Sequence, residues 1–203
     1  MWVIVGLGNP GPSYSHTRHN VGFSVVRALL SQTGGARLQP AFGGLVGSGA
    51  IGVSPVVFCL PMTYMNRSGG PVGDLVDALG IEADRVLVVH DDLDLSFGTV
   101  RCKKRGGHGG HNGLRDIARR IGREHPRVRF GIGRPSPGVS VSDHVLGTWA
   151  EAEQAALDLR IEQAVSAVEA ILQHGLDHAM NQFNVRAPTG VGHPPSETPK
   201  TLD

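Results

Sequence analysis

The sequence predicts an α/β fold built as one domain, with a twisted mixed sheet flanked by helices. Short apolar runs typical of buried strands alternate with segments that keep helical spacing, which favours a central sheet covered by helices. A length of 203 residues with 40% hydrophobic residues suits a single core. The domain is expected to span 1–186, because 187–203 is rich in Pro, Thr and Gly and is typical of a disordered tail.

The individual elements follow from apolar spacing and from the glycines and prolines that interrupt it. In the N-terminal half, the pattern predicts a strand at 3–5, a helix from about 20 to 30 that ends before Gly34 and Gly35, a hairpin over 42–53, a strand at 56–60 and a helix over 72–79 closed by Gly80. In the C-terminal half, it predicts a strand at 86–89, an edge strand at 98–102, a short helix over 114–121 with Asn112 as its N-cap, a strand at 128–132 and a long helix over 150–174 stopped by Gly175.

Positive charge is concentrated in two blocks, although the net charge is only +1. Residues 1–73 hold four arginines and no acid, and residues 101–134 hold eleven basic residues against Asp116 and Glu124. This asymmetry favours a polyanionic partner, nucleic acid first, although a basic face balanced by distant acids would give the same count.

The two cysteines, Cys59 and Cys102, are too few and too scattered for a disulfide framework or a zinc site. They are expected to be buried small side chains. No apolar run is long enough to span a membrane, and the N-terminus lacks the pattern of a signal peptide. A cytoplasmic location is therefore expected.

Residues 6–11 match the dinucleotide fingerprint G-x-G-x-x-G and follow a predicted strand. That fingerprint requires a helix that opens directly in the loop, and an acidic residue about 20 positions later. Pro10 and Pro12 remove two of the amides that would meet a pyrophosphate, and no acid precedes Asp74. The fold is therefore not expected to bind a dinucleotide.

Polar clusters follow several of the predicted strands, at 8–11, 64–66, 90–92 and 108–112. In open α/β sheets, ligands bind in a crevice at the carboxyl ends of the strands. We therefore expect these four clusters to meet in one crevice.

His19 is the candidate general base of this crevice. It lies at the start of the first predicted helix, beside Asn20 as a possible cap, where the positive end of the helix dipole disfavours the imidazolium form. Asp91, at the end of a buried strand, is the natural carboxylate to fix its tautomer. A lone histidine beside Arg18 is more often a surface residue, so the hypothesis depends on the neighbouring clusters. Because no serine or cysteine lies in a nucleophile context, water is the expected nucleophile.

A metal site is an alternative use of the histidines and aspartates. The candidate ligands are His90, Asp91, Asp92, Asp94, His108 and His111. Their spacing matches no recognised ligand motif, so neither a metal nor an organic cofactor is expected. A metal-dependent peptidase is the rival hypothesis, and retention of activity after chelation would remove it.

Taken together, the motifs resemble the bacterial peptidyl-tRNA hydrolase family. The matching stretches are 5–11 followed by Tyr14, 17–23, Pro61 with 64–66 and 68–69, 90–95 with Gly98, 109–114 and 131–135, and they extend from residue 3 to about 181. The resemblance implies the fold of that family. It also implies hydrolysis of the ester that joins a peptide, or an N-blocked amino acid, to the 3′ end of tRNA, which recycles tRNA during translation.

The resemblance implies roles for individual residues. His19 is the proton acceptor that activates water, Asp91 supports its basic form, and Asn9 helps to separate N-blocked from free aminoacyl-tRNA. The residues implied to line the tRNA and substrate site are Tyr14, Tyr64, Met65, Asn66, His111 and Asn112. The family acts as a cytoplasmic, metal-independent monomer, and its partner is peptidyl-tRNA, bound at the acceptor stem and 3′ end.

The basic block near the second glycine-rich loop is expected to contact tRNA phosphates irrespective of sequence. Its candidate residues are Arg101, Lys103, Lys104 and Arg105. In the resembling family this loop is usually rich in glycine or serine, so Lys104 and Arg105 depart from the pattern. A non-catalytic RNA-binding protein on the same fold is the alternative, and it would bind tRNA without turnover.

Overall fold

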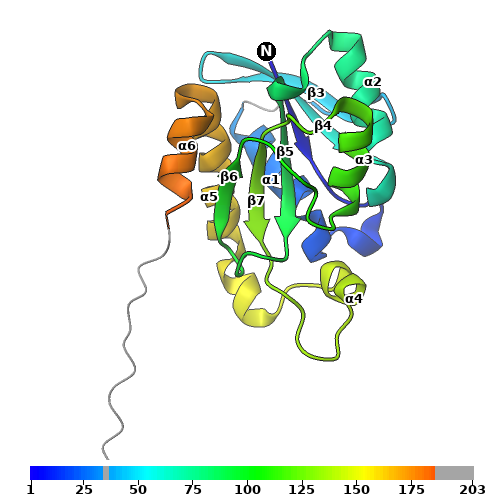
Figure 1. Ribbon diagram of the computed structural model, residues 1–203, viewed down its shortest axis with the longest axis vertical. Coiled ribbons are helices and arrows are strands. Elements are labelled where there is room, and N and C mark those ends of the chain that lie inside the picture. The colour runs from blue at the N-terminus through cyan, green and yellow to red at the C-terminus, as the bar shows by residue number, and fades with distance from the viewer. Residues whose placement is uncertain (34–36, 186–203) are drawn as a thin grey trace, which may run out of the picture.

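A seven-stranded mixed sheet forms the centre of this computed structural model, which describes residues 1–33 and 37–185 (Figure 1). The strand order is β2-β3-β4-β1-β5-β7-β6. The strands are β1 (Trp2–Gly6), β2 (Gln39–Ala41), β3 (Gly44–Ile51), β4 (Ser54–Pro61), β5 (Val86–Asp92), β6 (Val100–Lys103) and β7 (Arg127–Gly131). The four central strands β4, β1, β5 and β7 are parallel, and β2, β3 and β6 are antiparallel to their neighbours.

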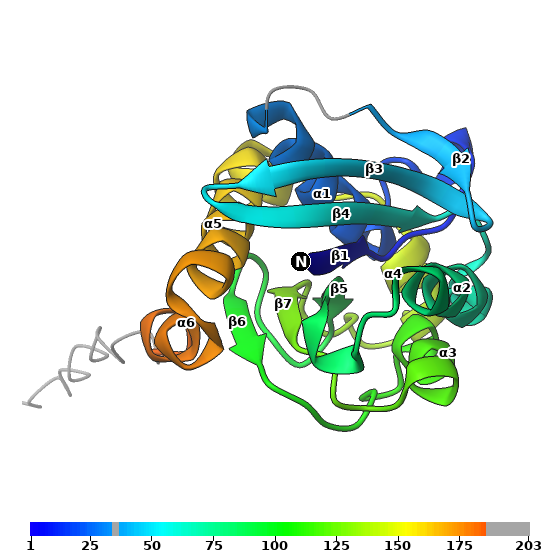
Figure 2. The same ribbon diagram turned by 90° about the horizontal axis from the view of Figure 1, so that it is seen from above.

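Helices cover both faces of the sheet, which Figure 2 shows from above. They are α1 (Val21–Gln32), α2 (Gly69–Leu79), α3 (Asn112–Ile121), α4 (Val141–Leu146), α5 (Glu151–His174) and α6 (Leu176–Phe183). One core cluster joins α1, α5 and α6 to one face, and a second joins α2 and α3 to the other. Alternate residues of β1 point into opposite clusters, Ile4 into the first and Val5 into the second, which explains the continuous apolar run. No helix in the described part of the chain is long and apolar enough to cross a membrane.

The predicted fold class is confirmed, and most predicted elements lie within a few residues of the observed ones. The glycine-rich loop after β1 leads into short 3-10 helices at Pro12–Tyr14 and Arg18–Asn20 before α1 begins at Val21. No α-helix opens in that loop, so the loop lacks the helix N-terminus that the dinucleotide fingerprint requires. Gly34 and Gly35 lie outside the described residues, as does the tail over 187–203, so these boundaries stay predictions.

Three element predictions were wrong or incomplete. Residues 42–53 are not a hairpin, because β3 pairs along its length with β4 and at its start with β2, and the turns fall at its two ends. Asn112 is not the N-cap of α3, since His111 occupies that position and its Nδ1 accepts from the Leu114 N–H at 3.3 Å. The short helices α4 and α6 and the edge strand β2 were not predicted.

Candidate active site

A cleft of about 880 Å³ opens at the carboxyl edge of the parallel strands. All four polar clusters contribute to its wall. The cleft is lined by the residues that were expected to form the catalytic and substrate site, namely Asn9, Tyr14, His19, Tyr64, Met65, Asn66, Asp91, His111 and Asn112. The parallel pairing of β4, β1 and β5 brings the clusters at 8–11, 64–66 and 90–92 together, because the loops after these strands leave from one edge. The cluster at 108–112 follows the antiparallel strand β6 and reaches the cleft through the loop that leads into α3.

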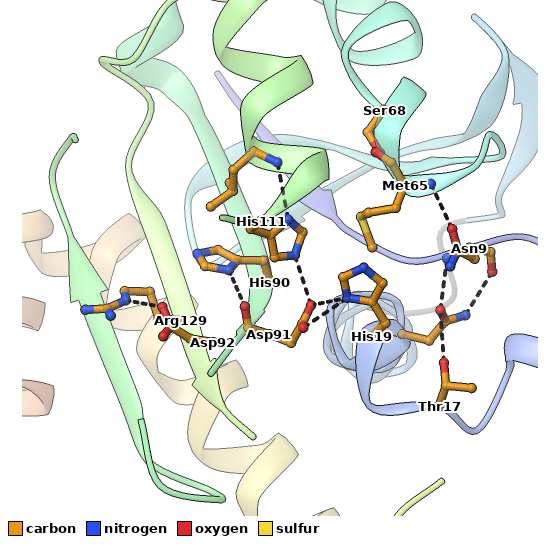
Figure 3. Close-up of polar contacts among 12 residues, drawn as sticks. Asn9, Thr17, His19, Met65, Ser68, His90, Asp91, Asp92, His111 and Arg129 are labelled. Atoms are coloured by element: carbon orange, nitrogen blue, oxygen red, sulfur yellow. Dashed lines mark hydrogen bonds and ion pairs between the residues drawn. The ribbon is translucent and has the colours of Figure 1, made fainter. Parts of the chain in front are cut away.

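Asp91 lies between two imidazoles at the end of β5 (Figure 3). His19 Nδ1 is 2.9 Å from Asp91 Oδ1 and 3.0 Å from Oδ2, and His111 Nε2 is 3.0 Å from Oδ1. The carboxylate is buried, with 3% of its residue surface exposed. Burial raises the pKa of Asp91, but attraction to His19 and His111 and their hydrogen bonds hold it well below its usual range.

The ionised carboxylate fixes the tautomers of both histidines, because it can only accept hydrogen bonds. His19 must carry its proton on Nδ1, which leaves the Nε2 lone pair without a hydrogen-bond partner among the described residues. His111 donates through Nε2, and its Nδ1 accepts from the Leu114 N–H at the start of α3. His19 Nε2 is therefore available to accept a proton in the cleft.

The electrostatics of His19 differ from the expectation based on the helix dipole. Burial lowers the pKa of His19, but the charge of Asp91 and its hydrogen bond outweigh burial and raise the pKa above its ordinary value of 6.5. The carboxylate thus makes Nε2 a stronger base than an isolated imidazole. Asn20 does occupy the N-cap position of α1, but its side chain makes no capping bond to the helix.

Asn9 is held in a fixed orientation by its neighbours. Asn20 Oδ1 accepts from the Asn9 N–H and Asn20 Nδ2 donates to the Asn9 carbonyl, both at 2.9 Å. Asn9 Oδ1 accepts from the Met65 N–H at 2.8 Å, which assigns the other end of the amide as Nδ2 (Figure 3). Nδ2 makes no hydrogen bond within the described chain, so the cleft contains a positioned amide donor beside the base.

A close approach of α1 to the sheet brings His19 to Asp91. A Cβ on Gly22 would lie 2.4 Å from the Val89 carbonyl oxygen and 2.5 Å from the Leu7 nitrogen, so only glycine fits there. On the outer side, Arg18 pairs with Glu153 of α5 at 2.6 Å and stacks over Trp149. Packing on one side and an ion pair on the other hold the 3-10 turn that carries His19.

The same side chains are the candidate ligands for a metal. His19, Asp91 and His111 each offer one ligand atom, and these atoms lie within 4.8 Å of one another. The two imidazole nitrogens are both hydrogen-bonded to Asp91, so a metal here would replace existing hydrogen bonds rather than fill an open ligand position.

Comparison with known proteins gives one family. The family model described as peptidyl-tRNA hydrolase matches residues 3–197. The chain belongs to the peptidyl-tRNA hydrolase family. Its relatives include the peptidyl-tRNA hydrolase of Syntrophotalea carbinolica, with 46% identity over 92% of this chain and 98% of the relative, and that of Acinetobacter baumannii, with 46% identity over 92% and 97%. The crystal structure of the Acinetobacter baumannii peptidyl-tRNA hydrolase aligns with a TM-score of 0.86 and 44% identity over 93% of this chain and 97% of that chain.

Membership of the peptidyl-tRNA hydrolase family gives the chain its reaction, the hydrolysis of the ester between a peptide and tRNA. The resemblance identified from the motifs is therefore confirmed, and so is the prediction that the protein is a peptidyl-tRNA hydrolase.

The four basic residues expected to contact phosphates do not lie together. Lys103 lines the cleft. Arg101 turns toward α6, where its Nη1 donates to the Asn184 carbonyl at 3.4 Å, and Arg105 is exposed beside Glu124 at 3.4 Å. Lys104 is exposed and does not line the cleft. Arg101 and Lys103 lie on the same face of β6, but the Arg101 side chain turns toward Asn184, and Lys104 and Arg105 continue into the loop.

Several residues of this peptidyl-tRNA hydrolase site were not singled out from the sequence. Arg127, which is 2% exposed, donates to the carbonyls of Gly106 and Gly107 at 2.6 and 2.7 Å and so anchors the second glycine-rich loop. Arg127 was counted only as charge, and nothing in the sequence pointed to its carbonyl partners. The helix α4 also lines the cleft, and its capping signature, Ser140 followed by Asp143, was readable in the sequence.

His90 was expected in the polar cluster at 90–92 and as a candidate metal ligand, but its contact with the backbone of Asp91 was not predicted. Its Nδ1 is 2.6 Å from the Asp91 carbonyl oxygen, and its ring packs edge-on against His111 with centroids 5.1 Å apart. Burial and the neighbouring His111 lower the pKa of His90 to about 3, so this ring is neutral. A neutral ring here adds no positive charge to compete for Asp91.

Proposed function

We propose that His19 is the general base of the hydrolysis and that a water molecule is the nucleophile. The observation that carries the proposal is the pair formed by His19 Nδ1 and the buried, ionised Asp91 at 2.9 Å, with Nε2 of His19 left for the cleft. Nε2 accepts a proton as water attacks the ester carbonyl, and Asp91 stabilises the imidazolium that forms.

The amide side chains of the cleft bind the peptide end of the substrate. Asn9 Nδ2 donates to the ester carbonyl or to the adjacent peptide group, where negative charge develops during attack. Asn66 and Asn112 line the same cleft, are exposed, and make no side-chain hydrogen bonds within the described chain. They can therefore donate and accept toward a peptide backbone without acting as bases.

The tRNA end of the substrate lies toward β6 and β7. Lys103 lines this side of the cleft together with Arg127 and Arg129. Arg129 also pairs with Asp92 at 2.7 Å, so Lys103 is the cation most available to an acceptor-stem phosphate. We propose a cytoplasmic monomer that acts without a metal and contacts the acceptor stem and the 3′ end.

Release of N-acetyl-phenylalanine from its tRNA tests this proposal. His19→Ala should reduce kcat about 1000-fold, within the range that general bases contribute, while tRNA binding is retained. Comparable rates for the variant and the wild type would contradict the role of His19. Binding of tRNA without turnover by the wild type would favour the non-catalytic alternative, and loss of activity in a chelator would favour a metal.

A further inference from the structure

The turn between β2 and β3 holds an aromatic residue in a conformation that favours asparagine or glycine. The flanking strands pair Ala41 with Gly44, so the turn has two residues. These residues, Phe42 and Gly43, have φ values of 51° and 70°, the pattern of a type I′ turn, in which Asn-Gly is preferred. Phe42 is the one non-glycine residue with positive φ in the described ranges, and a bulky side chain is strained there.

Folding does not explain the choice of phenylalanine. Phe42 is 42% exposed and belongs to neither hydrophobic cluster of the core. An asparagine would relieve the backbone strain and would expose less apolar surface to water. Strained residues that the fold does not require are concentrated at sites that bind ligands.

Two exposed side chains, Met62 and Tyr64, follow β4 between this turn and the cleft, and of these Tyr64 lines the cleft. Met62 donates its N–H to the Gly43 carbonyl at 3.1 Å, which places it against the turn, and it is 38% exposed. Tyr64, two residues later, is 60% exposed and lines the cleft. Phe42, Met62 and Tyr64 form what we call the apolar rim.

The register of the sheet places the apolar rim at the edge where the cleft opens. Gly44, at the start of β3, pairs with Pro61 at the end of β4, so the turn lies beside the carboxyl ends of the parallel strands (Figure 2). The strand order runs β6-β7-β5-β1-β4-β3 across the cleft. Lys103 and Arg129 are at one end of that order, His19 and Asp91 in the middle, and the apolar rim at the other.

We propose that the apolar rim binds apolar side chains of the peptide that is esterified to tRNA. The inference rests on the proposed function, since it takes the basic end of the cleft as the phosphate end. Two strand spacings separate β1, which precedes Asn9, from β3, a distance of roughly 10 Å. An extended peptide rises about 3.3 Å per residue, so the side chains about three residues from the ester reach Phe42.

Three substrates test the apolar rim. They are N-acetyl-Phe-tRNA, which is too short to reach it, and the acetylated tetrapeptidyl-tRNAs Leu-Leu-Leu-Phe and Ser-Ser-Ser-Phe. The wild type should prefer the leucine peptide over the serine peptide roughly five-fold in kcat/KM, as expected for one aromatic contact. Phe42→Asn should abolish this preference and leave N-acetyl-Phe-tRNA unchanged, with a melting temperature at or above that of the wild type.

Two further variants complete the experiment. Met62→Gln should weaken the same preference, and Val53→Asn should not, because Val53 is a fully exposed residue of the turn at the opposite edge of the sheet. Retention of the leucine preference in Phe42→Asn would overturn the proposal, and so would equal losses on all three substrates. Failure of the wild type to hydrolyse N-acetyl-Phe-tRNA would instead contradict the proposed function.

Discussion

Asp91 accepts hydrogen bonds from two imidazoles, and its burial makes these donors necessary. An isolated carboxylate removed from water is strongly destabilised unless donors compensate for the lost hydration. His19 and His111 supply them, both at Oδ1, and each is fixed in one tautomer as a consequence. The same contacts that stabilise the buried anion therefore aim one imidazole lone pair into the cleft.

Asn9→Asp separates the two functions of the Asn9 amide. The aspartate keeps an oxygen for the Met65 N–H but replaces the Nδ2 donor with an acceptor. We expect kcat/KM for N-acetyl-Phe-tRNA to fall about 100-fold with little change in melting temperature. Asn9→Ala should also lower the melting temperature, because it leaves the buried Met65 N–H unpaired. Unchanged activity of Asn9→Asp would contradict a donor role for Nδ2.

At the scale of elements, the close contact of α1 with Val89 of β5 and with Leu7 after β1 determines whether His19 reaches Asp91. Gly22→Ala would force the helix away from two backbone atoms that cannot move aside. We expect a loss of about 2 kcal/mol in unfolding free energy, measured by denaturant titration, and lower activity below the melting transition. Gly70→Ala on α2 is the matched control, since a Cβ there meets nothing within 4 Å. A stability of Gly22→Ala equal to that of the control would refute the close approach.

The end of β6 and the loop after it give a prediction for tRNA binding. Lys103→Gln should weaken tRNA affinity and reduce the slope of log affinity against log salt by about 1, because one phosphate contact is lost. Arg105→Gln should have a smaller effect, since Arg105 lies outside the cleft and is paired with Glu124. Titration of each variant with deacylated tRNA at several salt concentrations measures the affinity and its salt dependence. An identical slope for Lys103→Gln and the wild type would exclude this contact.

The elements that could be predicted are those whose signal is local. The strands of the sheet centre are continuous apolar runs because both of their faces are covered by helices. The prediction of a hairpin within 42–53 was wrong because this segment is mainly one strand, β3, with a partner on each side. A glycine-rich sequence does not show where a strand ends and the chain turns. Gly175 does end α5, but with φ at 88° it also begins α6, a second use that a stop signal does not reveal.

At the scale of the molecule, the site was predictable because parallel strands end at one edge of the sheet. The clusters that follow β1, β4 and β5 therefore had to converge, whereas the cluster at 108–112 reaches the cleft through the loop between β6 and α3. Finer choices could not be predicted, because they depend on tertiary contacts. His111 rather than Asn112 caps α3, Asn20 binds Asn9 rather than its own helix, and Arg101 turns away from its neighbours.

The pH dependence of kcat/KM tests most directly whether Asp91 holds His19 as a general base. Neutral His19 is the reactive form, so the rate rises with pH through the pKa of His19, which Asp91 raises above 6.5. Asp91→Asn removes the negative charge, so that pKa falls. The ascending limb should move to lower pH, and the plateau should fall by less than in His19→Ala. An ascending limb that stays in place or moves to higher pH would contradict this role of Asp91.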